Sequence, residues 1–363
     1  MTKFIKGLEL CEDFFNEYAK PIIDKYFPDL QYSAGLIGYG SDVLGYDDEV
    51  SRDHMWGPRF YMFLSDNDID KKSEIFNRFA ENLPYEYMGY SVNFTEPDWS
   101  DCGVQHPQFI NSGKVNPLIF IQTFDEFLID EIGTANLDNI TPLNWLAFSE
   151  HRLLSLVSGK LFVDKLNIRE QTAKINFYPD DVKLYLIASQ WELISSEQAF
   201  VKRCGDCGDE IGSQIICARI VERLMRLCFL YKGKYAPYSK WFGTAFNKLD
   251  IDENIKIKLN VALQANDLIE RENNLVEAQA LVADLHNASG LTDKADYGIE
   301  SYFGRDIKVI FADKFVDATV TKLKGTIFEN IPLIGTMSQF GGLSSFADEK
   351  QYYKQIKKLY GCK

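Results

Sequence analysis

At 363 residues, the chain is longer than one typical hydrophobic core supports, so its length favours two domains. A hydrophobic share of 46% and a charged share of 25% are those of an average globular protein. The formal charge of −14 argues against nucleic acid as the default partner, because binding a phosphate backbone requires a basic surface.

The sequence also bears on the cellular compartment. We find no apolar run long enough to span a bilayer, and the N-terminal residues lack the apolar core and cleavage site of a signal peptide. Seven scattered cysteines, an odd number, do not form a disulfide framework. We therefore expect a cytoplasmic protein with reduced thiols and no membrane partner, and its oligomeric state stays open.

The first third of the chain combines helical and strand patterns. Residues 1–27 carry apolar positions at helical spacing, and Pro21 is expected to interrupt that helix. A second helix, amphipathic, is expected over residues 71–82. The expected strands are residues 31–37, 59–64, 90–94 and 115–123.

From residue 124 onward, helical periodicity replaces the strand pattern. The expected helices are residues 124–132, 141–150, 151–157, 179–200, 213–230, 238–247, 251–265, 269–287 and 306–318. Strands followed by a run of helices predict an α+β fold, in which a mixed sheet with helices precedes an all-helical bundle. We place the two domains at residues 1–130 and 131–363.

The most informative stretch lies between the first two expected strands. An apolar run ends at Gly40-Ser41, an acidic loop follows, and Asp53 precedes the next apolar run. A turn of Gly and Ser offers free backbone N–H groups to a phosphate, and an Asp nearby can hold a divalent cation beside it. The stretch therefore predicts a nucleotide site, with Gly40 and Ser41 binding the nucleotide and Asp53 binding the metal.

The spacing of these residues resembles the nucleotidyltransferase superfamily. In that superfamily a Gly-Ser turn holds the triphosphate, and acids on the following strands bind magnesium. The sequence GSDVLGYDDEVSRDHMWGPR at residues 40–59 is similar to the signature of DUF4037, a bacterial family of uncharacterised nucleotidyltransferase-like proteins. Residues 148–164, 178–191, 208–249 and 331–340 resemble the helical domain of the same family.

The resemblance implies a fold and a reaction. The fold would be a nucleotidyltransferase-type sheet followed by a helical domain, similar in layout to aminoglycoside nucleotidyltransferases. The reaction would transfer a nucleotidyl group from a nucleoside triphosphate, with ATP the expected nucleotide, to an unknown small-molecule or protein acceptor. Magnesium would be the cofactor, and Asp53 would be both a catalytic residue and a metal ligand.

The sequence departs from this pattern at the metal ligands. The second acid is expected two residues after Asp53, where Met55 stands, and a thioether does not ligate magnesium. Asn116 is the best placed candidate for the third acid, and it is neutral. Substitutes are available at Asp47, Asp48, Glu49, Asp66, Asp68 and Glu96, unless the acidic loop is only a solvated surface. Two hypotheses follow: a nucleotidyltransferase with an incomplete ligand set, or a catalytically silent module of that fold that binds a ligand or a partner.

Basic side chains supply further candidates. Arg52 and Arg59 either contact phosphates or pair with acids of the loop, and we take Arg52 as a nucleotide-binding residue. His54 points to the opposite side from Asp53 if the segment is extended, which favours a structural role. Lys240 follows Pro237 at the start of an expected helix, where it either faces a ligand phosphate between the domains or is solvated while Tyr238 and Trp241 pack.

Two remaining motifs have simpler interpretations. Asp209 or Glu210 either caps the helix that follows or serves as a base for an acceptor hydroxyl, and capping is favoured. Cys204 and Cys207 form a single CxxC without a second ligand pair, so they are interpreted as free thiols.

Overall fold

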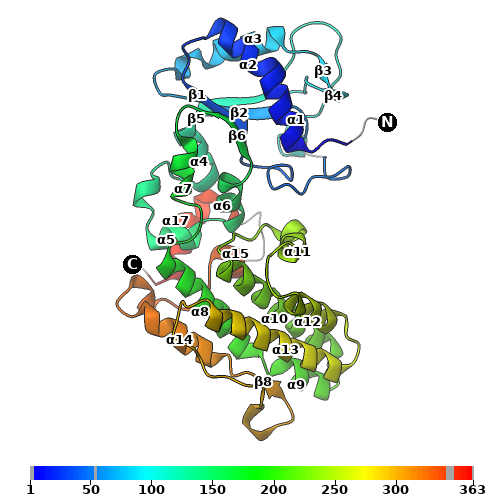
Figure 1. Cartoon of the computed structure of the whole chain (residues 1–363), viewed down its shortest axis with the longest axis vertical. Helices are drawn as coiled ribbons and strands as arrows, with labels where there is room; N and C mark the ends of the chain where they lie inside the picture. Colours follow the sequence, from blue (N-terminus) through cyan, green and yellow to red (C-terminus); the bar gives the residue numbers. More distant parts are fainter. Residues whose placement is uncertain (1–3, 53–54, 341–346, 362–363) are drawn as a thin grey trace. The chain divides into compact units, whose positions relative to one another are not determined.

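A computed structural model of the chain describes residues 4–52, 55–340 and 347–361 (Figure 1). The chain divides into two compact units, each described here by itself. Unit 1 comprises Met1–Asn139 and Arg152–Asn176, and unit 2 comprises Ile140–His151 and Phe177–Lys363. The chain therefore passes between the units three times, whereas the sequence analysis placed one boundary after residue 130. One of these passages falls inside the helix α6 (Glu150–Val157).

Unit 1 is built around a mixed sheet of four strands. These are β1 (Tyr32–Leu36), β2 (Arg59–Leu64), β5 (Leu118–Thr123) and β6 (Lys160–Asp164), in the order β5-β2-β1-β6. Strand β1 pairs antiparallel with both β2 and β6, and β2 pairs parallel with β5. The mixed sheet confirms the predicted fold class, and three of its strands lie where they were expected. The fourth strand, β6, was not predicted.

Helices cover both faces of this sheet (Figure 1). Alternation along β2 directs Phe60, Met62 and Leu64 into one core with α1 (Gly7–Phe14), α2 (Lys20–Tyr26) and α3 (Lys72–Asn82). Tyr61 and Phe63 face the other way, where their rings pack against Phe127 of α4 (Phe124–Ile132). Helix α4 matches its predicted bounds and begins with a capping box, in which the side chains of Thr123 and Glu126 bond to each other's backbone N–H.

Other parts of unit 1 differ from the expectation. The chain stays helical through Pro21, because a π-helical segment, Phe15–Ala19, precedes α2 and leaves Pro21 in the first turn, where its missing N–H is not needed. The expected strand at residues 90–94 is reduced to β4 (Tyr90–Ser91), which pairs with β3 (Glu86–Tyr87). The unit also contains α7 (Ile168–Ala173).

Unit 2 is a bundle of helices. They are α5 (Pro142–Ala147), α8 (Asp180–Glu197), α9 (Phe200–Asp206), α10 (Glu210–Tyr231), α11 (Ser239–Asn247), α12 (Glu253–Gln264), α13 (Leu268–Ala288), α14 (Asp313–Leu323), α15 (Met337–Phe340) and α17 (Tyr353–Leu359). Two short strands, β7 (Glu300–Ser301) and β8 (Lys308–Val309), pair antiparallel. The expected helix at 306–318 starts only at Asp313, because Phe311 has a φ of +53° and cannot continue a right-handed helix. Within the described ranges, no helix is both long enough and apolar enough to cross a membrane.

A chain of hydrogen bonds crosses the core of unit 2. Trp191 Nε1 donates to Tyr231 Oη, which lies 2.8 Å from His286 Nδ1. On the other side, His286 Nε2 lies 2.8 Å from Thr292 Oγ1, whose own proton goes to the carbonyl of Asp293. This arrangement assigns the proton of neutral His286 to Nε2. Burial lowers the pKa of His286 to about 4.

Candidate functional site

The turn after β1 has the backbone conformation that its glycines allow. Gly38 has a φ of +84° and Gly40 a φ of +123°. The loop then folds back on itself, since Tyr46 N–H donates to Ser41 O at 2.8 Å and Ser41 Oγ donates to Ser51 O at 3.1 Å. Within the described residues, the backbone N–H groups of Gly40 and Ser41 donate to no protein group. The turn therefore presents two successive free donors, as an anion-binding turn does.

A buried ion pair lies directly behind this turn. Arg59 Nη2, at the start of β2, donates to both carboxylate oxygens of Asp42, at 2.7 and 3.0 Å, and to the carbonyl of Tyr39 at 3.0 Å. The guanidinium also packs 4.4 Å from the centre of the Tyr39 ring. Of the two roles considered for Arg59, the structure therefore has the pairing with a loop acid. Burial is the largest single influence and disfavours the charged guanidinium, but Asp42, with smaller contributions from neighbours such as Tyr39, raises the pKa of Arg59 above its ordinary value.

Position 40 requires glycine for a second reason. A Cβ atom there would collide with Asp42 Oδ1 and Arg59 Nη2. The absence of a side chain is what lets the ion pair lie against the backbone of the turn. The Nε and Nη1 atoms of Arg59 are buried and have no hydrogen-bond partner in the described part of the chain. A guanidinium with two unsatisfied donors thus lies beside the free N–H groups of the turn.

The acids of the loop have structural partners. Asp47 is buried, and its Oδ2 accepts from Gly7 N–H at 2.7 Å and from Trp56 Nε1 at 3.2 Å. Asp48 Oδ1 accepts from the N–H groups of Val50 and Ser51, which lower its pKa. These bonds hold the loop in place, so its acids are not merely a solvated surface.

Asn116, the candidate for the third metal ligand, has a different role. Its Nδ2 donates to the carbonyl of Phe94 at 3.1 Å, and its N–H donates to Asn93 Oδ1 at 2.8 Å. The side chain therefore fastens the segment before β5 to residues 93–95. An amide suits this position better than an acid because it can donate to carbonyl oxygens.

The predicted metal ligand and its neighbour, Asp53 and His54, lie outside the described residues. Among the described residues, no group of three or more His, Cys, Asp or Glu side chains is arranged to hold a metal ion. Met55 lies near Tyr39, whose hydroxyl is 3.8 Å from its sulfur. Strand β2 begins at Arg59, six residues after Asp53 in the sequence.

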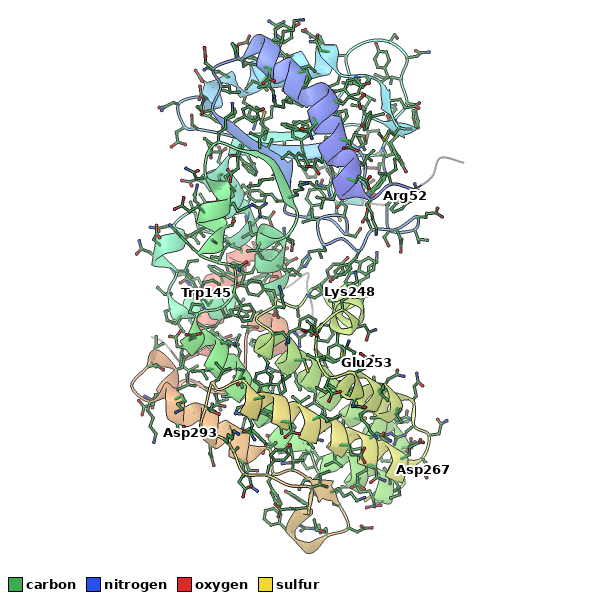
Figure 2. The ribbon with its side chains drawn as sticks, viewed as in Figure 1. Arg52, Trp145, Lys248, Glu253, Asp267 and Asp293 are labelled. Carbon is green, nitrogen blue, oxygen red and sulfur yellow. The ribbon has the colours of Figure 1, made fainter. Side chains whose placement is uncertain are left out.

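The two other predicted nucleotide-binding residues lie in different units. Arg52 is an exposed residue of unit 1 (Figure 2); its Nε donates to the carbonyl of Glu49, and its guanidinium lies 5.8 Å from the Trp56 ring. Lys240 is exposed in the first turn of α11 in unit 2, with its Nζ 5.0 Å from the ring of Trp241. Trp241 itself is buried, as the solvated alternative for Lys240 expected.

The remaining motifs have the simpler of their two interpretations. Asp209 caps α10, with its Oδ1 accepting from Gly212 N–H at 2.8 Å. Cys204 and Cys207 lie at the end of α9 as free thiols.

Comparison with known proteins assigns part of the chain. Residues 145–242 match the model of DUF4037, a domain of unknown function. Over these residues the chain is similar to the DUF4037 family. Among solved structures, a nucleotidyltransferase-like protein from Exiguobacterium sibiricum 255-15 resembles the chain with a TM-score of 0.33 and 9% identity, covering 82% of this chain and 98% of its own. The curated proteins contain no match to the chain.

The DUF4037 segment supplies most of the lining of a cavity in unit 2, whose volume is about 370 Å³. Glu150 and Arg226 bring charge to it, and Met225, Tyr238 and Phe242 bring apolar surface. The sequence analysis proposed none of these as a ligand contact. They come from three separate segments, and each fits a helical periodicity by itself, so no local pattern in the sequence distinguishes them from structural residues.

Proposed function

We propose that the chain binds a nucleoside triphosphate together with magnesium and transfers a nucleotidyl group to an acceptor. The nucleotide site would be the turn at Gly40 and Ser41, with ATP as the expected nucleotide. The observation that carries the proposal is the pair of free backbone N–H groups in this turn, directly after a buried strand. Successive N–H groups of this kind bind phosphate oxygens.

Arg59 supports the same assignment. Its Nε and Nη1 are buried donors without a partner in the described residues, and such donors cost free energy unless something accepts from them. A phosphate oxygen or a water bound with the nucleotide would satisfy them. Because Nη2 is held by Asp42, the guanidinium is already oriented before any ligand arrives.

Magnesium would be held by Asp53 in this proposal. Asp42 is committed to Arg59 and Asp47 to Gly7 and Trp56, which leaves Asp48, Glu49 and Asp53 as the acids of this loop for a cation. Of these, the resemblance to nucleotidyltransferases favours Asp53. When bound, magnesium would neutralise charge on the reacting phosphates. Arg52 is proposed as a further contact to the phosphates, and the acceptor would be a small molecule or a protein.

Isothermal titration calorimetry with ATP and magnesium tests the proposal. We expect saturable heat from the natural chain and about tenfold weaker binding for Asp53→Asn, which loses a charged metal ligand. Ser41→Ala should also weaken binding, because it removes the hydrogen bond from Ser41 Oγ to Ser51 O that holds the turn. Ser158→Ala and Asp70→Asn, which change the same residue types elsewhere in unit 1, should bind as the natural chain does. The absence of heat, or equal binding by all four variants, would overturn the proposal.

The rival function is a catalytically silent module that binds a ligand or a partner. Met55 favours it, because it stands where the second acid is expected. The two functions differ in turnover. Release of pyrophosphate from ATP in the presence of an acceptor extract, abolished by Asp53→Asn, supports the transferase; nucleotide binding without release supports the silent module.

A further inference from the structure

The cavity in unit 2 lies at one side of α10. Val221, Glu222, Met225 and Arg226 line it from that helix, at spacings that place them on one face. Its volume of about 370 Å³ lies at the lower end of the range for small-molecule sites. Apolar surface forms most of the wall, and Glu150, Glu222 and Arg226 form a charged cluster in it. This combination is typical of a site for an organic ligand.

Glu150 is the more deeply buried acid of this charged cluster. Its side chain is 4% exposed, and its Oε1 accepts from Ala236 N–H at 2.9 Å. Its own N–H donates to Ser338 Oγ at 3.0 Å, which fixes the first residue of α6 in place. Burial raises the pKa of Glu150, while Arg226 and the N–H of Ala236 act in the opposite direction. The carboxylate is thus held by one oxygen, and its other oxygen, Oε2, accepts no hydrogen bond from the described residues.

Arg226 is the basic residue of the charged cluster. Its Nε and Nη2 both donate to Glu222 Oε1, at 3.0 and 2.8 Å, and its guanidinium lies 5.1 Å from the centre of the Phe242 ring. Its Nη1 donates to no group in the described parts of unit 2. Nη1 instead faces Glu150 Oε2 at 3.6 Å, which is an ion-pair distance but longer than a hydrogen bond.

Glu150 Oε2 is an acceptor and Arg226 Nη1 is a donor, and the two lie side by side without a hydrogen bond. A ligand group that satisfies both must be able to donate and to accept. A hydroxyl donates one proton and accepts on its lone pairs, so a single oxygen can donate to Glu150 Oε2 and accept from Arg226 Nη1. An ammonium has only donors, so it would leave Arg226 Nη1 without an acceptor. A carboxylate or phosphate has only acceptors and would be repelled by Glu150.

The walls select the rest of the ligand. Met225, Tyr238 and Phe242 line the cavity, with the Tyr238 ring 4.8 Å from that of His151 and the Phe242 ring packed on Phe229. Such walls favour an apolar, preferably aromatic, body. We propose that this cavity is a binding site for an uncharged organic molecule that carries a hydroxyl group on an apolar body, with the hydroxyl bridging Glu150 and Arg226. This proposal does not depend on the proposed nucleotide site.

Three probes that differ only in their polar group test the proposal on the full-length chain. They are 2-naphthylmethanol, 2-naphthylmethylamine and 2-naphthoate, and binding is measured by ligand-observed NMR with calorimetry. We expect the alcohol to bind tightest of the three. Glu150→Gln should weaken it by about tenfold, because the amide must keep its oxygen on Ala236 N–H and then turns a donor toward the hydroxyl.

A second variant covers the case in which Glu150→Gln fails to fold. Ala218 is exposed at the edge of the cavity, so Ala218→Trp fills the entrance without disturbing buried contacts and should abolish binding of the alcohol. Ala288→Trp, at an exposed position of α13 away from the cavity, and Glu253→Gln, at the start of α12 (Figure 2), are the matched controls and should bind normally.

The proposal is overturned if the amine or the carboxylate binds as tightly as the alcohol, if none of the probes binds, or if Ala218→Trp leaves binding unchanged. Ser41→Ala and Asp53→Asn should leave binding of the alcohol unchanged. A failure of the nucleotide site is therefore distinguishable from a failure of this one.

Discussion

Arg59 Nη2 lies 2.7 Å from Asp42 Oδ1, and both side chains are only 1% exposed. The pair connects the first residue of β2 to the turn that follows β1, so it fixes the predicted phosphate-binding turn relative to the sheet. Because the pair is buried, the loss of one partner should change the free energy of unfolding strongly. An isolated charge in the interior is costly, whereas a paired one is tolerated.

Removing one partner of this pair should destabilise unit 1 strongly. We expect Arg59→Met or Asp42→Asn to lower the free energy of unfolding by about 3 kcal/mol or more, because each leaves the other charged or polar group buried without its partner. The double variant should lose less than the sum of the two single losses. Urea unfolding followed by circular dichroism measures this cycle. The exposed pair Lys20–Asp24 is the control, and its disruption should cost less than about 1 kcal/mol; equal costs for the two pairs would contradict the prediction.

Gly40 and Gly45 offer a matched pair of glycine substitutions in one loop. Both have positive φ, of +123° and +72°, but a Cβ at Gly45 would meet nothing within 4 Å, whereas one at Gly40 would strike the Asp42–Arg59 pair. Gly45→Ala should cost only the conformational strain, about 1 kcal/mol. Gly40→Ala should cost more and should lower the melting temperature further. Similar melting temperatures for the two variants would show that the ion pair moves freely away from the turn.

His286 should make stability depend on pH. Its pKa is lowered from 6.5 to about 4 in the folded chain, so the unfolded chain binds the proton more readily. The contribution of His286 to the free energy of unfolding is therefore fully present above about pH 6.5. This contribution is lost as the pH falls from 6.5 toward 4, and the loss amounts to up to roughly 3 kcal/mol. The cause is burial, which disfavours the charged imidazolium. Protonation of Nδ1 would also remove the acceptor that faces the Tyr231 hydroxyl.

Urea unfolding between pH 4.5 and 8 measures this dependence. The variant His286→Gln cannot titrate in this range, so its stability should change less between pH 7 and pH 5 than that of the natural chain. Carboxylates contribute equally to both proteins and cancel in the comparison. A parallel pH dependence in the two proteins would exclude His286 as the cause.

Position 55 tests whether the missing acid limits metal binding. Met55 has a φ of +50°, a conformation that Asp adopts more readily than Met, so Met55→Asp should fold normally. If Asp53 binds magnesium, a second carboxylate two residues away should tighten that binding by about tenfold, equivalent to roughly 1.4 kcal/mol. Magnesium titration by calorimetry measures it, with Met55→Asn as the uncharged control. Equal affinities for the Asp and Asn variants would show that residue 55 does not face the metal.

The spacing of apolar residues in the sequence predicted the helices and strands that are determined by neighbouring residues alone. Helix α4 has its predicted bounds, and strands β1 and β2 agree to within a residue, because buried alternating or continuous apolar runs with clear ends determine them. Strand β6 was missed because its edge position leaves it half-buried, without a continuous buried apolar run, and it follows α6 closely. Its identity as a strand is decided by pairing with β1, which is distant in sequence.

The candidate site was predictable to a similar degree. The glycines of the turn were identified from the residue types that anion-binding turns need, but the partner of Arg59 was left open between a phosphate and a loop acid. The acid chosen, Asp42, is adjacent to the turn itself, and no periodicity distinguishes it from Asp47 or Asp48. The cavity at Glu150 was not foreseen, since its lining is assembled from α6, α10 and the segment before α11.

The place of β6 in the sheet has a consequence for how the chain is made and handled. A fragment that ends near residue 130 would contain β1, β2 and β5 but would leave the outer edge of β1 unpaired, and such edges promote aggregation. The ribosome, likewise, must deliver residues 140–151 of unit 2 before it delivers the strand that closes the sheet of unit 1. A soluble fragment of unit 1 therefore needs residues through 176, with the passage through unit 2 replaced by a linker.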